Sequence, residues 1–303
     1  MRYRAVVCLY IVLHAFTVCS QSAVQTFLTP SDTLHSSRRN TVVITEASLG
    51  SLTLIGLNTL WYSDYKRSKL HTINDNNEWF QLDKMGHAFS GYQLGRLGAQ
   101  TLQWSGVSKR NQLLYGGTLG FSFLTAVEVL DGFSEEWGFS WGDFIANIAG
   151  AGLFIGQELL WNQQRIALKY SFHQTKYAAL NPNKLGNGLT EEFLKDYNGQ
   201  TYWLSVNVHS FFKECKVPKW LNIAFGYGAN GMLAGTHDVQ LSKGFYQKRY
   251  AQYYLSLDLD LSKIQTNSAL LRTLFSVFNS IKVPLPTMEF NSENGLKFYP
   301  IYF

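Results

Sequence analysis

Four stretches of this chain are each about as long as a lipid bilayer is thick, and each carries at least one acidic residue. They cover residues 41–62, 83–104, 111–133 and 141–161. A helix of about 20 residues can cross a bilayer, but a charged side chain inside a membrane is costly. We therefore expect four helices that pack against one another and turn their acids inward.

The composition lies between that of a soluble protein and that of a polytopic membrane protein. Charged residues make up 16% of the 303 residues and aromatic residues 15%, whereas a typical soluble domain has about 25% charged residues. The mean hydropathy of −0.09 nonetheless disfavours a conventional transporter. These values indicate a chain that contacts a membrane but does not consist of uncharged membrane-spanning helices.

Glycines spaced four residues apart recur on three consecutive predicted helices. Such pairs let helix backbones approach closely. They predict a tight bundle, although the chain has 25 glycines and an accidental spacing is the alternative. The three pairs are Gly91 and Gly95, Gly116 and Gly120, and Gly152 and Gly156.

Polar side chains fall on the same faces as these glycines. Residues four apart lie on one side of a helix, which aligns Asp83 with His87 and Asp143 with Asn147. Glu128 lies on the small-residue face of the third helix. We therefore predict a buried polar cluster that contains all five residues.

An isolated buried carboxylate costs more than a fold can tolerate, so the cluster needs partners. Three arrangements remain open: a network of shared protons and hydrogen bonds, a divalent cation held by His and carboxylate ligands, or an acid/base pair that acts on a substrate. The sequence contains no independent metal motif and indicates no cofactor.

The rim of this cluster is expected in the neighbouring residues and in the connector of residues 131–143. Acids and aromatic rings alternate there between glycines. The connector is either a lid that presents acids beside aromatic faces or a turn whose tryptophans lie at a membrane interface. The expected rim residues are Lys84, Asp131, Glu135, Glu136, Trp137 and Trp141.

After the turn-rich residues 181–188 the pattern changes to period two. In residues 254–263, leucines alternate with Ser and Asp, which predicts a strand. Weaker strands are expected at 202–211, 220–227, 281–290 and 296–303, with an amphipathic helix at 270–281. The apolar-out, polar-in alternation and the terminal Phe303 are typical of outer-membrane barrel walls, but about five strands cannot close a barrel of at least eight. We therefore favour a small sheet beside the bundle.

Residues 1–20 have the pattern of a secretory signal peptide, with two arginines, an apolar stretch and small residues before Gln21. Lipidation at Cys19 is the alternative. Removal of this segment lowers the formal net charge from +5 to +3, which is too small to indicate a nucleic-acid partner. It also leaves Cys215 alone, so no intrachain disulfide is expected. Residues 21–40 form a polar leader arm.

An ordered set of motifs resembles a known family. It comprises Asp83-Lys84-x-x-His87, a Glu128-x-x-Asp131 pair, and Trp-Gly-x-Ser-x-x-Asp-x-x-Ala-Asn-x-x-Gly at residues 137–150. The set is similar to that of the YfiM-like predicted bacterial periplasmic lipoproteins and, more distantly, of VanZ-like membrane proteins, which are linked to glycopeptide-antibiotic resistance. The resemblance spans residues 41–161. It implies an envelope protein of helical hairpins and no established reaction.

We therefore expect an α+β protein with a hydrophobic, membrane-associated four-helix bundle at residues 41–170 and a small antiparallel β-rich module at residues 171–303. The expected role is binding or scaffolding in the bacterial cell envelope, with a membrane lipid or envelope component as partner and a helix-mediated oligomer left open. The alternative is an enzyme for a lipid-linked or cell-wall substrate, with Glu128 or Asp83 as base and His87 as proton carrier. We expect the outer membrane or its periplasmic face, with the inner membrane as the alternative.

Overall fold

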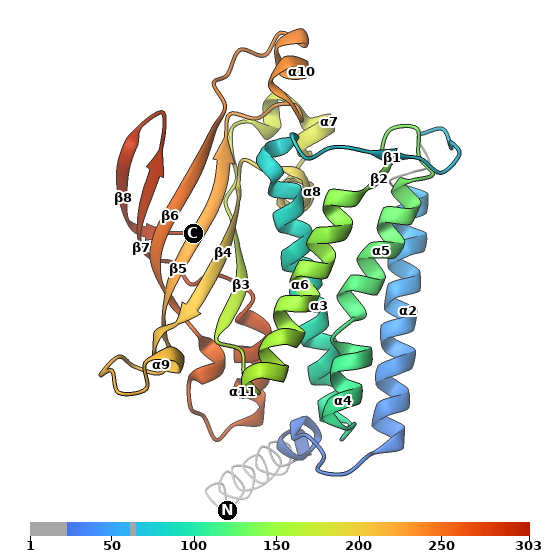
Figure 1. The fold of residues 1–303 in the computed structure, drawn as a ribbon, viewed down its shortest axis with the longest axis vertical. Coiled ribbons are helices and arrows are strands. Elements are labelled where there is room, and N and C mark those ends of the chain that lie inside the picture. Colours follow the sequence, from blue (N-terminus) through green and yellow to red (C-terminus); the bar gives the residue numbers. More distant parts are fainter. Residues whose placement is uncertain (1–22, 61–64) are drawn as a thin grey trace, which may run out of the picture.

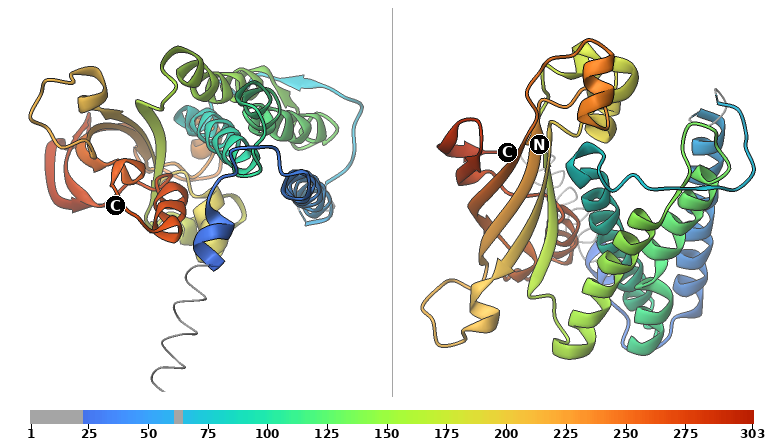
Figure 2. Two further views of the ribbon diagram at one scale, coloured as in Figure 1. Left: turned by 90° about the horizontal axis from the view of Figure 1, so that it is seen from below. Right: turned by 45° about the horizontal axis from the view of Figure 1, so that its top comes forward.

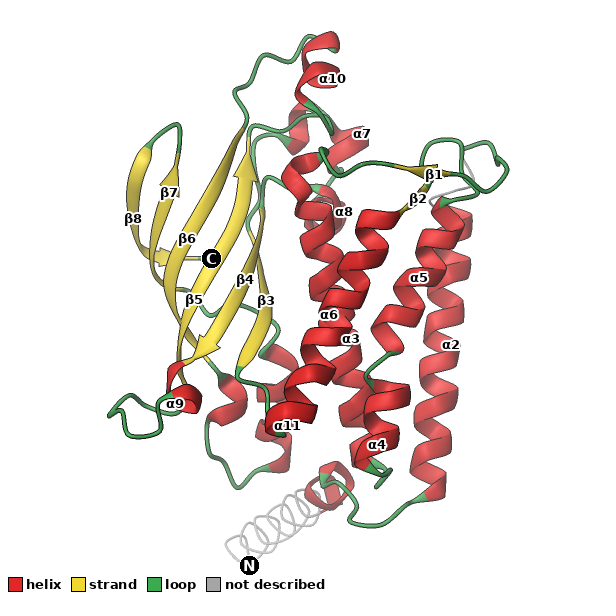
Figure 3. Ribbon diagram, in the orientation of Figure 1, coloured by secondary structure: helices red, strands yellow, loops and turns green. Residues whose placement is uncertain are grey.

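The computed structural model describes residues 23–60 and 65–303 and places a bundle of helices beside a curved antiparallel sheet (Figure 1). The long helices, which come mainly from the first half of the chain, lie on one side, and the strands of the large sheet, which come from the second half, lie on the other (Figure 3). The predicted α+β class is thereby confirmed. The predicted signal peptide, with Cys19, lies outside the described residues.

Four long helices form the bundle: α2 (Ser36–Leu60), α3 (Leu82–Trp104), α5 (Leu119–Asp131) and α6 (Trp141–Trp161). The segment expected as one third helix is divided, because a short α4 (Lys109–Asn111) and a π-helical turn (Gln112–Gly116) precede α5. Helix α3 is central, since it packs against the other three and also against the sheet. Most side chains of α3 are therefore at least partly covered by a neighbouring element.

Glycines set the distance between α3 and the α5 segment. A Cβ atom added at Gly95 would lie 2.5 Å from the carbonyl oxygen of Gly117, and one added at Gly120 would lie 2.5 Å from that of Gly91. Real Cβ atoms do not come this close to a backbone. The first two predicted glycine pairs therefore lie at helix contacts.

The third predicted pair does not lie at a contact. Among the described residues, nothing is within 4 Å of a Cβ added at Gly152 or Gly156. Helix α6 instead approaches α3 through Gly150, whose added Cβ would lie 2.0 Å from the carbonyl oxygen of Ala88. The spacing pattern was right about close packing and wrong about which glycines of α6 provide it.

Three described helical segments are long and apolar enough to cross a membrane by length and composition: Ser36–Thr59, Lys109–Asp131 and Trp141–Trp161. Much of their apolar surface is not covered by protein. On α2, for example, Ile44 is 65% exposed and Leu52 64% exposed.

The large sheet has six antiparallel strands in sequence order: β3 (Ile166–Phe172), β4 (Gln200–Asn207), β5 (Leu221–Asn230), β6 (Tyr250–Leu259), β7 (Leu285–Asn291) and β8 (Gly295–Tyr302). Seen from below, it curves around one of its faces (Figure 2). Strand β3 begins inside the segment expected to be helical, residues 41–170. Its side chains are largely buried on both faces, so it lacks the alternation that marks a half-buried strand.

Short elements connect these parts. Strand β1 (Thr72–Ile73) pairs in parallel with β2 (Phe139–Ser140). The short helices are α7 (Pro182–Leu185), α8 (Leu189–Lys195), α9 (Val208–Phe211) and α10 (His237–Ser242), with 3-10 turns at Trp79–Gln81, Ala178–Leu180 and Leu261–Lys263. Helix α11 (Ala269–Phe278) is the predicted amphipathic helix. In the leader arm, residues 23–28 are helical, and Trp104 donates a hydrogen bond to the carbonyl oxygen of Phe27.

Candidate functional site

Helix α3 starts directly after a strained turn. Trp79, Phe80 and Gln81 have φ values of 47°, 52° and 62°, a left-handed region that residues other than glycine rarely adopt. The turn is held by the sheet side of the molecule, because the Tyr227 hydroxyl donates to the Phe80 carbonyl oxygen at 2.9 Å and the Trp79 amide donates to that of Gly235 at 2.8 Å. These contacts fix the first turn of α3.

That first turn places the ammonium group of Lys84 among three carboxylates. Its Nζ atom lies 2.6 Å from Asp75, 3.6 Å from Asp83 and 3.1 Å from each carboxylate oxygen of Asp143. Lys84 is only 8% exposed. The sequence placed this lysine at the rim, whereas it lies at the centre of the acids and neutralises part of their charge.

For both Lys84 and Asp75, ion pairs and hydrogen bonds together affect the pKa more than burial does. Burial by itself lowers the pKa of Lys84, but Asp83, Asp75 and Asp143 raise it above its ordinary value. Burial by itself raises the pKa of Asp75, but hydrogen bonds from Lys84 and Ser140 hold it below its ordinary value. The lysine and this aspartate are therefore charged at neutral pH.

His87 connects the acids to the third and fourth helices. Its Nδ1 atom lies 3.0 Å from Oδ1 of Asn147, which accepts a hydrogen bond from the ring. Its Nε2 atom faces Oε1 of Glu128 at 3.5 Å and Oδ1 of Asp83 at 4.0 Å. An imidazole whose Nδ1 is fixed by an acceptor has its Nε2 free to gain or lose a proton.

The protonation of His87 should make stability depend on pH. Burial by itself lowers its pKa, but Asp83, Asp143, Glu128 and the hydrogen bond to Asn147 raise it above the ordinary 6.5. A raised pKa in the fold means that protonation stabilises fully below about pH 6.5 and that this contribution is lost as the pH rises through the folded value. We expect the free energy of unfolding of wild type to exceed that of His87→Gln by more at about pH 6 than at about pH 9. Urea titrations at both pH values measure this difference, and one that is constant or grows with pH would contradict the charged imidazole.

Ser140 joins Glu128, Asp75 and Asp143 at the start of α6. Its amide donates to Oε2 of Glu128 at 3.1 Å and its hydroxyl donates to Asp75 at 2.7 Å. The same hydroxyl accepts from the amide of Asp143 at 3.2 Å, so it caps α6. One serine thus binds two carboxylates and caps the helix that carries the third.

The structure brings together the five residues of the predicted cluster, Asp83, His87, Glu128, Asp143 and Asn147. Sequence reasoning missed Asp75, Ser140 and Tyr197, whose hydroxyl donates to Asp83 at 2.8 Å. All three lie outside the interiors of the four long helices, so the helical spacing that found the others could not reach them.

Of the other expected rim residues, Asp131 lies one turn after Glu128 on α5, and side chains of the connector contact other parts of the chain. Glu136 pairs with Lys184 at 2.7 Å, and the ring of Trp137 packs edge-on against Tyr65. Trp141 is 57% exposed. The connector is tied by backbone hydrogen bonds to residues 66–71, from Glu135 among others, and Asp131 ends α5.

A pocket of about 240 Å³ opens onto Asp83 and His87 between α3 and the β3–β4 side of the sheet. Apart from these two groups its walls are mainly aromatic and aliphatic, and no lysine or arginine is among the described residues that line it. The wall residues are Gly86, Phe89, Ser90, Leu124, Tyr170, Phe193, Leu194, Tyr197, Gln200 and Tyr202.

The ligand atoms of Asp83, His87 and Asp143 lie within 4.8 Å of one another, a spacing that a divalent cation can bridge. However, the Lys84 ammonium already contacts both aspartates. The carboxylates thus have a cationic partner from the protein itself, and the arrangement suits a network of hydrogen bonds and protons better than a metal centre.

Comparison with known proteins adds one finding for this part of the chain. No curated protein and no solved structure matches this chain. Residues 73–156, which contain Asp75 and all five residues of the predicted cluster, match the model of a family described as predicted periplasmic lipoprotein (DUF2279). The helical half of this chain thus carries the segment typical of an exported envelope protein family that has no known biochemical activity.

Proposed function

We propose that this protein is a membrane-associated envelope protein that binds an amino-bearing envelope amphiphile, such as a lipid with an ethanolamine head group, in the pocket beside Asp83. The observation that carries the proposal is that the pocket has a charged, polar floor and mainly apolar walls. One carboxylate and one imidazole form its polar floor, and aromatic and aliphatic side chains form most of its walls.

The charge of the floor favours a ligand with an amine. The side chain of Asp83 is 31% exposed, whereas those of Lys84 and Asp143 are 10% and 4% exposed. A ligand in the pocket therefore meets the carboxylate of Asp83, and the lysine that balances the acids stays behind it. A charge-assisted hydrogen bond of this kind contributes about 1.5–3 kcal/mol.

The size of the pocket favours a head group over a whole lipid. Sites for drug-sized ligands begin at about 300 Å³, and this pocket has about 240 Å³. Leu194 at its wall is 60% exposed. An acyl chain that leaves the pocket along such exposed apolar residues would continue toward the membrane.

We expect the detergent-purified protein to bind short-chain phosphatidylethanolamine about tenfold or more tightly than short-chain phosphatidylglycerol, because only the former offers an amine to Asp83. Native mass spectrometry or calorimetry measures both affinities. Asp83→Asn should remove the preference, and Leu194→Trp should weaken both affinities by filling the pocket.

Asp238→Asn is the matched control, because Asp238 is exposed on α10 and is not among the residues that line this pocket. It should leave both affinities unchanged. Equal affinity for the two lipids in wild type, or an unchanged preference in Asp83→Asn, would refute the proposed ligand class.

The geometry of His87 supports a second candidate function, an acid/base enzyme for a lipid-linked or cell-wall substrate. Asn147 orients the ring, and Nε2 faces Glu128 and Asp83 at the pocket floor. In this case the protein would convert the bound amphiphile, and a folded His87→Gln variant would bind it without conversion. Mass spectrometry of the lipid after incubation separates the two functions.

A further inference from the structure

On the six-stranded sheet many inward side chains are polar or charged, whereas the outward side chains of β5 to β7 include exposed apolar ones. On β5 and β6, Phe225 is 53% exposed and Leu257 is 43% exposed, whereas Asn222 and Asp258 are at most 1% exposed. The same holds on β7, where Phe290 points out and Glu289 is buried. A sheet that faces water on one side shows the opposite alternation, with apolar residues in the core.

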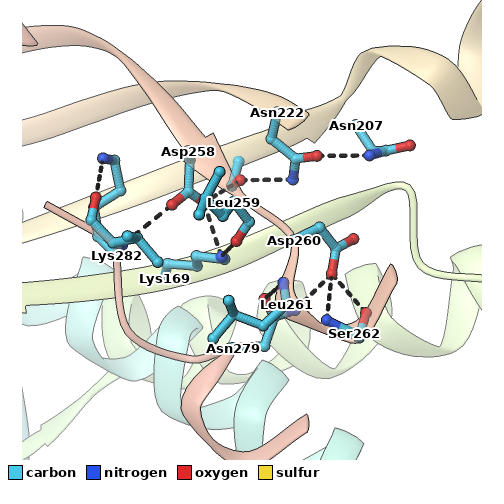
Figure 4. A network of polar contacts seen from close by, with 12 residues as sticks. Lys169, Asn207, Asn222, Asp258, Leu259, Asp260, Leu261, Ser262, Asn279 and Lys282 are labelled. Carbon is cyan, nitrogen blue, oxygen red and sulfur yellow. Dashed lines mark hydrogen bonds and ion pairs between the residues drawn. The ribbon is translucent and has the colours of Figure 1, made fainter. Parts of the chain in front are cut away.

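The interior combines a network of hydrogen-bonded polar and charged side chains (Figure 4) with a small buried cluster of Trp203, Ala224, Tyr254 and Tyr302. Lys169 pairs with Asp258 at 2.8 Å, and neither side chain has any exposed surface. Asp258 also accepts from Ser205 at 2.6 Å, which in turn accepts from Asn222 at 2.8 Å. A chain gains little by burying charges and exposing phenylalanines to water, so the outer face needs another environment.

The edge strand β3 pairs at one residue, Tyr170, with the chain just before β7. The amide of Tyr170 on β3 donates to the carbonyl oxygen of Ser280, and the carbonyl oxygen of Tyr170 accepts from the amide of Lys282, just before β7. At the other end, the Tyr302 hydroxyl of β8 meets that of Thr201 on β4 at 3.2 Å. The bonds of Tyr170 satisfy two backbone groups of this edge strand, as a hydrocarbon environment requires, and the hydroxyl contact links β8 to β4 through side chains.

The outer face is continuous with the surface of the bundle. On β3 and β4, the outward rings of Tyr170 and Tyr202 pack against Phe89 of α3, with ring centroids 5.7 and 6.1 Å apart. The helices therefore cover part of the outer face at β3 and β4, and Tyr227 of β5 contacts the turn before α3. Phe225, Leu257 and Phe290 farther along the face are exposed. Helix α6, and α2 on the far side of the bundle from the sheet (Figure 1), also expose aliphatic side chains, among them Leu159 and Ile44.

We infer that the outward face of β5 to β8 is in contact with the acyl chains of a lipid bilayer, so that sheet and helices share one membrane-facing surface. The ten-residue lengths of β5 and β6 suit this role, since a strand in a bilayer needs about 9–11 residues. The inference does not depend on a ligand in the pocket beside Asp83, because it rests on the outward side chains of β5 to β8.

The test uses single cysteines that carry a nitroxide label, in the exported protein with Cys215→Ser, reconstituted into vesicles of phosphatidylethanolamine and phosphatidylglycerol. Phe225→Cys and Leu257→Cys probe the outer face of β5 and β6. Lys243→Cys, exposed next to α10, is the control. Collision of the label with oxygen, which concentrates in lipid, is compared with collision with a water-soluble nickel chelate.

We expect the labels at residues 225 and 257 to favour oxygen and the label at residue 243 to favour the nickel chelate. A preference for the chelate at residues 225 and 257 would overturn the inference by placing this face in water. Dipolar broadening that disappears on dilution with unlabelled protein would overturn it as well, because a second copy would then cover the face.

Discussion

Replacing Asp258 with asparagine is expected to lower the free energy of unfolding by about 3–5 kcal/mol, the usual cost of leaving a buried charge without its partner. Lys169 would keep its hydrogen bond to the Leu259 carbonyl oxygen at 2.7 Å but would lose the carboxylate 2.8 Å away. Urea-induced unfolding of the detergent-solubilised protein measures the loss.

A double variant tests whether the unpaired charge is the cause. Lys169→Met with Asp258→Leu removes both charges, and such apolar replacements are often neutral or stabilising. It should recover most of the loss. The exposed Asp238→Asn is the control and should leave the unfolding midpoint unchanged. If Asp258→Asn were as stable as this control, the buried ion pair would not be a feature of the folded protein.

Gly150→Ala is expected to destabilise the bundle by about 3 kcal/mol, at the upper end of the usual cost of overpacking. The added methyl group would lie 2.0 Å from the carbonyl oxygen of Ala88, so α3 and α6 must separate. Asn147 lies on α6 one turn before this contact and His87 directly precedes Ala88 on α3. Their 3.0 Å hydrogen bond should therefore weaken together with the packing.

Gly152→Ala on the same helix is the matched control, and we expect it to raise stability where Gly150→Ala lowers it. A Cβ there would meet nothing within 4 Å among the described residues, and alanine in a helix interior stabilises by about 0.5–1 kcal/mol relative to glycine. Thermal unfolding of both variants in detergent compares them directly. Equal effects of the two substitutions would contradict the close approach of α3 and α6 at Gly150.

Helical spacing found much of the candidate site from the sequence. Asp83 with His87 and Asp143 with Asn147 are pairs one helical turn apart, and the pattern places each pair on one face of its helix. The sequence predicts Lys84 at the rim, because helical spacing states on which face of the helix a side chain lies but not which residues it contacts. Its role at the centre depends on Asp75, which reaches it from a loop.

The sequence by itself determined the α+β class, the four helical regions and the polarity of the leucine strand, because periodicity along the chain states which residues share a face. It did not determine that β3 belongs to the sheet, that Gly150 replaces Gly152 and Gly156 at the helix contact, or that Lys169 meets Asp258. Those contacts join residues far apart in the chain, and only the packing of whole elements fixes such distances. The tertiary structure also decided that the polar face of the leucine strand is the inner one. The sheet curves so that Asp258 of this strand is enclosed with Lys169.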